Sequence, residues 1–149
     1  MKYIASISDN YPYKYYGEFI SQNDCDYLMF IEGKKIHNII DYKIVYNISK
    51  SDNLYKWDIL ATNRTIYLIN ERVKELIKAL GVNNVEYLPA NAFTITGSII
   101  DGYYILNILD GKDIYRNDET QIIYSEHFVR EFKKRKLKGL TFYPLDIKE

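Results

Sequence analysis

Two segments of the chain, residues 66–89 and 122–144, carry the same order of apolar and polar positions. In each, an apolar run leads into a helix-capping residue, an amphipathic stretch with apolar positions at helical spacing, a glycine, a short apolar run and a proline. The distance from the cap (Asn70 or Ser125) to the closing proline is the same in both segments. The pattern predicts two strand–helix–strand units. It therefore favours an α+β fold with a mixed or antiparallel sheet and two principal helices.

The ends of both predicted helices are marked by their side chains. Asn70 and Ser125 are favourable N-cap residues, and each is followed by a glutamate in the first turn, where the helix dipole favours acidic groups. Gly81 stands where a left-handed residue ends the first helix, and Gly139 precedes the last strand. The apolar stripes that should face the core are Val73, Leu76, Ile77 and Leu80 in the first helix, and Phe128, Val129 and Phe132 in the second.

Other apolar runs predict strands. These runs are Tyr3–Ile7, Tyr27–Ile31, Lys43–Ile48, Thr65–Ile69, Ile122–Tyr124 and Tyr103–Leu109. The turn signal after Tyr27–Ile31 predicts a hairpin whose returning arm is Lys35–Ile40, whereas Leu54–Leu60 fits a short helix or a strand equally well. Tyr103–Leu109 is almost wholly apolar, which predicts a central strand covered on both faces, followed by a tight turn at Asp110 and Gly111.

The length of 149 residues suits one domain, residues 1–149, with a core that needs no staple. The single cysteine, Cys25, excludes an internal disulfide and suits a reducing compartment. We find no signal-peptide core and no apolar run of bilayer-spanning length, so we expect a soluble cytoplasmic protein with no membrane partner. The formal net charge of zero argues against nucleic acid as a partner.

Tyrosine is unusually frequent, with 16 tyrosines against 6 phenylalanines. Tyrosine is enriched at protein interfaces because its ring is apolar and its hydroxyl is polar. The alternative is a compositional bias of an AT-rich genome, since Ile, Lys and Asn are also abundant. The tyrosines Tyr11, Tyr13, Tyr15 and Tyr16 gather in one segment that Pro12 interrupts and Gly17 ends, which predicts a loop or edge segment.

The sequence offers few arrangements that carry out chemistry. His37 and His127 are the two histidines, and neither lies in a closely spaced Cys/His cluster that would bind a metal ion. Cys25 with His37, or Ser125 with His127, is conceivable as a nucleophile and base, but Ser125 is better explained as an N-cap. There is also no glycine-rich phosphate loop. We therefore predict no catalytic residue, no metal, no cofactor and no enzymatic activity.

Two charged clusters remain. Asp110, Asp113, Asp118 and Glu119 form an acidic segment that is either a solvated loop or a patch for a basic protein partner. Residues 130–138 are rich in lysine and arginine, which is typical of a solvated helix end because cations complement the helix dipole.

The chain resembles the bacterial polymorphic-toxin immunity proteins of the "immunity eleven" (MXAN-type) group, formerly a domain of unknown function. The resemblance covers roughly residues 55–145 and rests on the order of its motifs. These are Trp57-Asp58-Ile59-Leu60, Ile69-Asn70-Glu71-Arg72-Val73, Val85-Glu86-Tyr87-Leu88-Pro89, Tyr103–Leu109 followed by Asp113, Ser125-Glu126-His127-Phe128 and Lys138-Gly139-Leu140-Thr141-Phe142. The chain departs from the family in a shorter stretch between Asp113 and Ser125, in Asn70 as the first cap, and in a loosely matching N-terminal third.

The resemblance implies a cytoplasmic protein that binds a cognate protein toxin and neutralises it by stoichiometric occlusion, with no catalytic residues of its own. The toxin-binding surface would be the acidic segment or the Tyr11–Tyr16 loop. Two alternatives stay open: an enzyme or small-molecule-binding protein, and a phage- or host-encoded interaction module. The sequence predicts no particular oligomeric state.

Overall fold

The computed structural model describes residues 1–36, 40–109, 113–119 and 121–145, and within them the strands form three mostly antiparallel sheets accompanied by two α-helices. This arrangement confirms the predicted α+β fold. In chain order the elements are β1 (Lys2–Ile7), the 3-10 helix η1 (Tyr13–Tyr15), β2 (Glu18–Ser21), the 3-10 helix η2 (Asp26–Phe30), β3 (Tyr42–Tyr46), the 3-10 helix η3 (Leu54–Lys56), β4 (Ile59–Leu60), β5 (Leu68–Asn70), α1 (Glu71–Ala79), β6 (Val85–Pro89), β7 (Ala92–Thr94), β8 (Tyr103–Ile108), β9 (Ile114–Arg116), β10 (Ile122–Ser125), α2 (Glu126–Lys134) and β11 (Leu140–Leu145).

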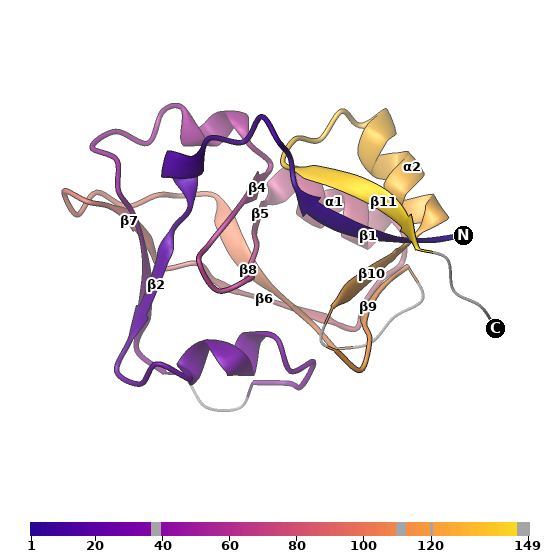
Figure 1. Cartoon of the computed structure of the whole chain (residues 1–149), viewed down its shortest axis with the longest axis horizontal. Helices are drawn as coiled ribbons and strands as arrows, with labels where there is room; N and C mark the ends of the chain where they lie inside the picture. Colours follow the sequence, from indigo (N-terminus) through magenta and orange to yellow (C-terminus); the bar gives the residue numbers. More distant parts are fainter. Residues whose placement is uncertain (37–39, 110–112, 120, 146–149) are drawn as a thin grey trace.

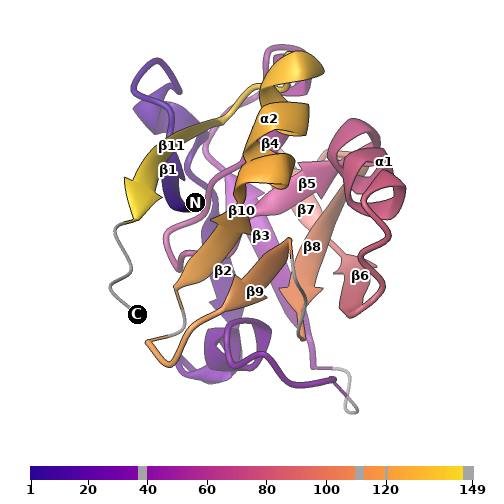
Figure 2. The same cartoon turned by 90° about the vertical axis from the view of Figure 1, so that its right-hand side faces the viewer.

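The two predicted strand–helix–strand segments build two four-stranded sheets on the same plan. One sheet has the order β4-β5-β8-β6 and the other the order β9-β10-β1-β11. In each, the strands before and after the helix are separated by a third strand that runs antiparallel to both. We call these the first unit (β4, β5, α1, β6 and β8) and the second unit (β9, β10, α2, β11 and β1). Their helices pack against each other (Figure 2).

The two units also agree in strand register. Pro89 of β6 lies opposite Tyr104 of the middle strand β8, and Pro144 of β11 lies opposite Tyr3 of the middle strand β1. The chain connections differ, because β8 comes after the other elements of the first unit in the sequence, whereas β1 comes before the other elements of the second unit. The third sheet, β2-β3-β7, lies at the opposite end of the molecule from β1, β11 and α2 (Figure 1).

Both predicted N-caps are confirmed. The Asn70 side chain accepts a hydrogen bond from the Val73 backbone N–H at 3.2 Å, and Ser125 Oγ accepts one from the Phe128 N–H at 3.0 Å. Each bond satisfies a donor that the first turn of a helix leaves without an intrahelical partner. The predicted apolar stripes face the core, and their fully buried members are Val73, Leu76, Ile77, Phe128, Val129 and Phe132.

An aspartate lies behind each N-cap. Asn70 Nδ2 donates to Asp58 Oδ1 at 2.7 Å, and Ser125 Oγ donates to Asp113 Oδ1 at 2.5 Å; in both units the aspartate comes 12 residues before the cap. Asp58 Oδ2 also accepts a hydrogen bond from the Lys138 N–H at 2.7 Å. Because Lys138 precedes β11, the Asp58 carboxylate joins the first unit to the second.

The C-terminal turns of the two helices are equivalent as well. Gly81 has φ +73°, as predicted, and Lys136 takes the same place after α2 with φ +55°. The next residue in each case donates its N–H back into the helix, Val82 to the Ile77 carbonyl and Leu137 to the Phe132 carbonyl, both at 3.2 Å. The second helix therefore ends with a left-handed residue that carries a side chain.

Replacing Lys136 with glycine is expected to raise the free energy of unfolding by about 0.5–1 kcal/mol. Glycine removes a left-handed strain of about 1–2 kcal/mol, which outweighs the backbone entropy that it adds to the unfolded chain. Urea titration followed by circular dichroism measures the change. Gly81→Ala is the matched control and should lower stability by about 1 kcal/mol. A loss of stability in Lys136→Gly would contradict the equivalence of the two helix ends.

The core has two parts on opposite faces of the first unit's sheet. On one face, Tyr103 and Ile105 of β8 join buried residues of β3 and the N-terminal segments. On the other face, Ile108 of β8 joins the buried residues of α1, α2 and the second unit. This confirms β8 as a central strand covered on both faces.

The predicted strand Tyr27–Ile31 is wrong, because its first four residues belong to the 3-10 helix η2 and Ile31 is the C-cap of that helix. The Asn23 N–H binds Asp26 Oδ2 at 3.2 Å, which starts a helical turn just before the apolar residues. Phe30, 2 % exposed, then packs edge-on against Phe19 and Tyr42, so the run is buried without pairing as a strand. A short apolar run is compatible with either a strand or a helix, and here tertiary packing favours the helix.

Other boundaries also differ. The predicted returning arm Lys35–Ile40 forms no strand at residues 35, 36 and 40, and its remaining residues lie outside the described part of the chain, as does the turn predicted at Asp110 and Gly111. The ambiguous Leu54–Leu60 contains both η3 and β4, and the strand predicted from Thr65 begins only at Leu68. The short strands β2, β7 and β9 had no clear signal in the sequence.

Candidate functional site

The Tyr11–Tyr16 loop contains two buried and two exposed tyrosines. Tyr11 and Tyr15 are 5 % and 6 % exposed and belong to the core, whereas Tyr13 is 89 % and Tyr16 is 38 % exposed. The four therefore have two roles: Tyr11 and Tyr15 attach the loop to the fold, and Tyr13 and Tyr16 face the solvent.

Hydrogen bonds and close packing attach the loop to the core. The Tyr11 hydroxyl accepts a hydrogen bond from the Ala61 N–H at 3.0 Å and donates to the Tyr15 carbonyl. Burial raises the pKa of Tyr11 well above its ordinary value, so the hydroxyl keeps its proton. At the end of the loop, Gly17 lies so close to the core that a Cβ would stand 2.6 Å from Ile44 and Tyr46. Tyr11 also contacts the Trp57 ring, with a centroid distance of 5.0 Å.

The exposed rings rest on this base. The Tyr16 ring packs edge-on against Tyr11, and the Tyr13 ring leans against Tyr16, with a centroid distance of 5.6 Å in each pair. The loop thus presents two aromatic side chains to the solvent from a fixed backbone, so that little conformational freedom remains to be lost on binding a partner.

The predicted acidic segment is divided by β9. Asp113 lies just before β9, where its carboxylate accepts the hydrogen bond from Ser125 Oγ and stands 4.0 Å from His127 Nδ1. Asp118 and Glu119 lie beyond the other end of this strand, which by itself spans about 10 Å. Both are exposed, and Asp110 lies outside the described residues. Asp113 thus serves the cap of α2, whereas Asp118 and Glu119 lie in the exposed segment that follows β9.

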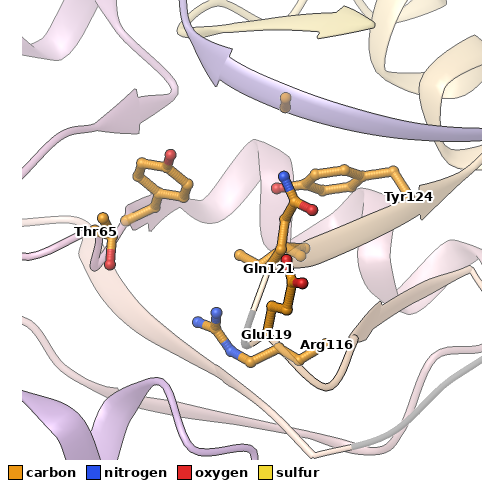
Figure 3. Close-up of a pocket in the computed structure, with 8 residues that line it drawn as sticks. Thr65, Arg116, Glu119, Gln121 and Tyr124 are labelled. Atoms are coloured by element: carbon orange, nitrogen blue, oxygen red, sulfur yellow. The ribbon is translucent and has the colours of Figure 1, made fainter. Parts of the chain in front are cut away.

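A cavity of about 270 Å³ lies between the β4–β5 connection and the β9–β10 hairpin (Figure 3). Figure 3 shows the Gln121 side chain beside the Tyr124 ring with Glu119 below it, whereas the Arg116 side chain extends toward the side on which Thr65 lies. The lining residues are Ala5, Thr65, Tyr67, Arg116, Glu119, Gln121, Ile122 and Tyr124. The cavity therefore lies between the two units, and the middle strand β1 of the second unit contributes Ala5 to its lining.

Three polar side chains of the cavity influence one another electrostatically. Burial raises the pKa of Tyr67, and the nearby phenol of Tyr16 adds to the rise; burial also raises the pKa of Tyr124, where the phenol of Tyr67 adds to it. Both hydroxyls therefore stay protonated at physiological pH. Burial also lowers the pKa of Arg116, although a guanidinium titrates so high that it stays charged. The cavity therefore combines two phenol groups and a cation as hydrogen-bond donors.

A second and wider hollow, of about 440 Å³, lies between the β6–β7 turn and the segment that enters β8. Its lining includes Tyr87, Phe93, Ile99 and Tyr104, and the charged residue among those that line it is Asp101. The Asp101 N–H binds the Tyr55 hydroxyl at 3.1 Å. This hollow offers mainly contact area, whereas the cavity between the units offers converging polar groups.

Of the two candidate nucleophiles, Ser125 has a structural role, and no described residue serves as a base for Cys25. Ser125 Oγ is occupied by Asp113 and by the Phe128 N–H, as the cap interpretation predicts. Cys25 is exposed, and its suggested partner His37 lies outside the described residues. Within the described ranges, no group of three or more His, Cys, Asp or Glu side chains is placed to hold a metal ion.

Sequence reasoning missed Asp58 and Arg116 as important side chains. Asp58 had a signal, since an aspartate stands 12 residues before the cap in both units. Arg116 had none, because its place in the cavity depends on the packing of the two hairpins.

Comparison with known proteins gives one partial likeness. No protein-family model matches the chain. A segment of the protein translocase subunit SecA of Fervidobacterium nodosum is 33 % identical to it over 119 residues, which is 76 % of this chain and 13 % of SecA. The chain thus spans 13 % of the length of that protein. No helix among the described residues is long and apolar enough to cross a bilayer.

Proposed function

We propose that the protein is an immunity protein, which binds a cognate bacterial toxin in the cytoplasm and neutralises it by covering the surface that the toxin needs. The observation that carries the proposal is the pair Tyr13 and Tyr16, which are exposed on a loop fixed by two buried tyrosines. Exposed tyrosines on a rigid base are typical binding anchors, because they add large contact area at little entropic penalty. Occlusion requires such a surface and no catalytic group.

The residues of the motifs that carry the family resemblance have structural roles, which supports a binding surface on the Tyr11–Tyr16 loop. Asp58, Asn70 and Ser125 stabilise the helix caps, and Pro89 lies at the end of β6 in register with β8. The residues behind the resemblance are thus framework. The Tyr11–Tyr16 loop lies in the N-terminal third, where the resemblance is loose. A common framework with individual binding loops suits proteins that each recognise one toxin.

The proposal is tested with the product of the neighbouring gene. We expect the two purified proteins to co-elute as a complex and co-expression to protect cells from the toxin. Tyr13→Ala and Tyr16→Ala should each weaken binding about tenfold or more, because each removes an exposed anchor and keeps the hydrogen bonds of Tyr11 that attach the loop. Isothermal titration calorimetry measures the affinities.

Tyr143→Ala is the matched control, since Tyr143 is 45 % exposed on β11 of the second unit and should leave the affinity unchanged. Absence of both complex and protection would contradict the function. A complex that both loop variants form with full affinity would instead contradict the loop as its binding surface.

A further inference from the structure

The hollow between the β6–β7 turn and the segment that enters β8 carries a carboxylate that the fold does not use. The volume of the hollow is about 440 Å³, and Asp101 is the charged residue of its lining. Within the described part of the chain, the Asp101 carboxylate takes part in no hydrogen bond and no ion pair, since the bond to the Tyr55 hydroxyl is donated by the Asp101 backbone N–H. A negative charge is therefore available to a ligand in this hollow.

An aromatic ring and an exposed aliphatic side chain share the hollow with this carboxylate. Phe93 of β7 and Ile99 form an antiparallel bridge, so their side chains project from the same side of the paired segments. Both line the hollow together with Asp101. Ile99 is 66 % exposed, and Ile95, in the turn between the two bridged residues, is 59 % exposed. The hollow thus combines one carboxylate with an exposed apolar surface.

Phe93 is the ring of the lining that is best placed to receive a cation. The Lys74 ammonium already lies over the rings of Tyr87 and Tyr104, at 4.8 and 4.3 Å from their centroids. Tyr103 is only 6 % exposed. Phe93 has no ring contact and no cation over it among the described residues, so a cation from outside can approach its face.

The neighbouring charges do not oppose such a cation. The ammonium of Lys74 is accompanied by the carboxylate of Glu71, to which the Tyr104 hydroxyl donates at 3.3 Å. Asp101 therefore leaves this region with a net negative charge. A carboxylate beside an aromatic face is well suited to a guanidinium, which pairs with the carboxylate through two parallel hydrogen bonds and stacks on the ring.

The exposed apolar rim favours a protein as the source of the guanidinium. A small cation bound alone would leave Ile95 and Ile99 in contact with water, whereas apolar neighbours on a protein surface would cover them. Arginine and aromatic residues are also enriched in the buried centres of protein interfaces.

We propose that the hollow is a docking site for a protein partner that inserts an arginine side chain. The guanidinium pairs with Asp101 and stacks on Phe93, and apolar residues that flank the arginine cover Ile95 and Ile99. The described lining contains no residue of the Tyr11–Tyr16 loop, so this surface is separate from the loop and does not rest on toxin binding.

Nuclear magnetic resonance titration of the full chain with short blocked peptides tests the proposal. We expect acetyl-Leu-Arg-Leu-amide to shift the amide signals of residues 92–102 saturably. It should bind about fivefold or more tightly than the same peptide with citrulline, which has the shape of arginine without its charge. Acetyl-arginine-amide should bind more weakly than the arginine peptide, because it cannot cover the two isoleucines.

Two variants separate the carboxylate from the ring. Asp101→Asn should bind the arginine and citrulline peptides equally, and it should fold because the backbone N–H makes the contact with Tyr55. Phe93→Leu keeps an apolar side chain and should weaken the arginine peptide more than the citrulline peptide. Asp24→Asn, which changes an exposed aspartate before η2, is the matched control and should bind like the unchanged protein.

Four results would overturn the docking site. They are the absence of any shift in residues 92–102, equal binding of the arginine and citrulline peptides, and a folded Asp101→Asn protein that keeps the preference for arginine. The fourth is an acetyl-arginine-amide that binds as tightly as the arginine peptide, which would indicate a site for a small cation and not for a protein.

Discussion

Replacing Asp58 with alanine is expected to lower the free energy of unfolding by about 3–5 kcal/mol, a large part of the stability of a domain of this size. Asp58 is 3 % exposed, and its carboxylate accepts hydrogen bonds from Asn70 Nδ2, Arg72 Nη1 and the Lys138 N–H. Removing it leaves the amide and backbone donors without their acceptor, at about 1–3 kcal/mol for each buried group. It also cuts a link between the two units.

The other aspartate of the pair is the control. Asp113 has a side chain that is 21 % exposed and accepts a hydrogen bond from Ser125 Oγ, so Asp113→Ala should lose only about 1–2 kcal/mol. Arg72→Ala should have a small effect too, because 56 % of the Arg72 side chain is exposed and water screens its ion pair with Asp58. Urea unfolding followed by circular dichroism ranks the three variants. Equal losses in the two aspartate variants would contradict the role of Asp58 as the link between the units.

The parts of the fold that depend on local chemistry could be predicted from the sequence. Asn70, Ser125 and Gly81 determine the ends of helices through bonds and φ values that involve only their neighbours in the chain. The run Tyr103–Leu109 revealed a central strand because both faces of it are apolar. The matched spacing of cap and proline revealed two like units, although not that a third strand separates the two strands of each.

The parts that depend on tertiary packing could not be predicted. Tyr27–Ile31 is not a strand because Phe30 packs edge-on against Phe19 of β2 and Tyr42 of β3, contacts between segments that no local pattern predicts. The spacing of the loop tyrosines has no period, so nothing distinguished the buried Tyr11 from the exposed Tyr13. The cavity lined by Arg116 forms only when the β4–β5 and β9–β10 hairpins pack against each other. The apolar pattern of a single strand does not predict that packing.

The abundant tyrosines have a role in the core that the sequence did not indicate. The Tyr46 hydroxyl donates to the Ala61 carbonyl at 3.0 Å, and the Tyr103 hydroxyl donates to the Trp57 carbonyl at 2.6 Å. Each ring fills apolar space while its buried hydroxyl donates its proton to a backbone oxygen and is thereby satisfied. Many tyrosines therefore stabilise the fold in their protonated form, which makes the fold sensitive to alkaline pH.

We expect the protein to unfold cooperatively about one to three pH units above pH 10. Burial raises the pKa of Tyr11, Tyr46, Tyr103 and Tyr124 well above the value of about 10 in an unfolded chain. Below pH 10 both states hold these protons and the stability is constant. Above it the unfolded chain releases protons that the folded protein retains, so the free energy of unfolding falls by about 1.4 kcal/mol per pH unit for each tyrosine.

Four such groups together remove about 5 kcal/mol per pH unit, which exhausts a stability of about 5–15 kcal/mol within one to three pH units. The partly buried Tyr42 and Tyr87, each with its pKa raised to about 12 by burial, add to the same trend. Urea titrations between pH 8 and pH 11 measure the slope, and tyrosinate absorbance should show exposed phenols titrating before the unfolding transition. Tyr46→Phe removes one of the four protons and should reduce the slope by about a quarter. A stability that stays constant through pH 11 would show that the buried phenols do not hold their protons as the structure requires.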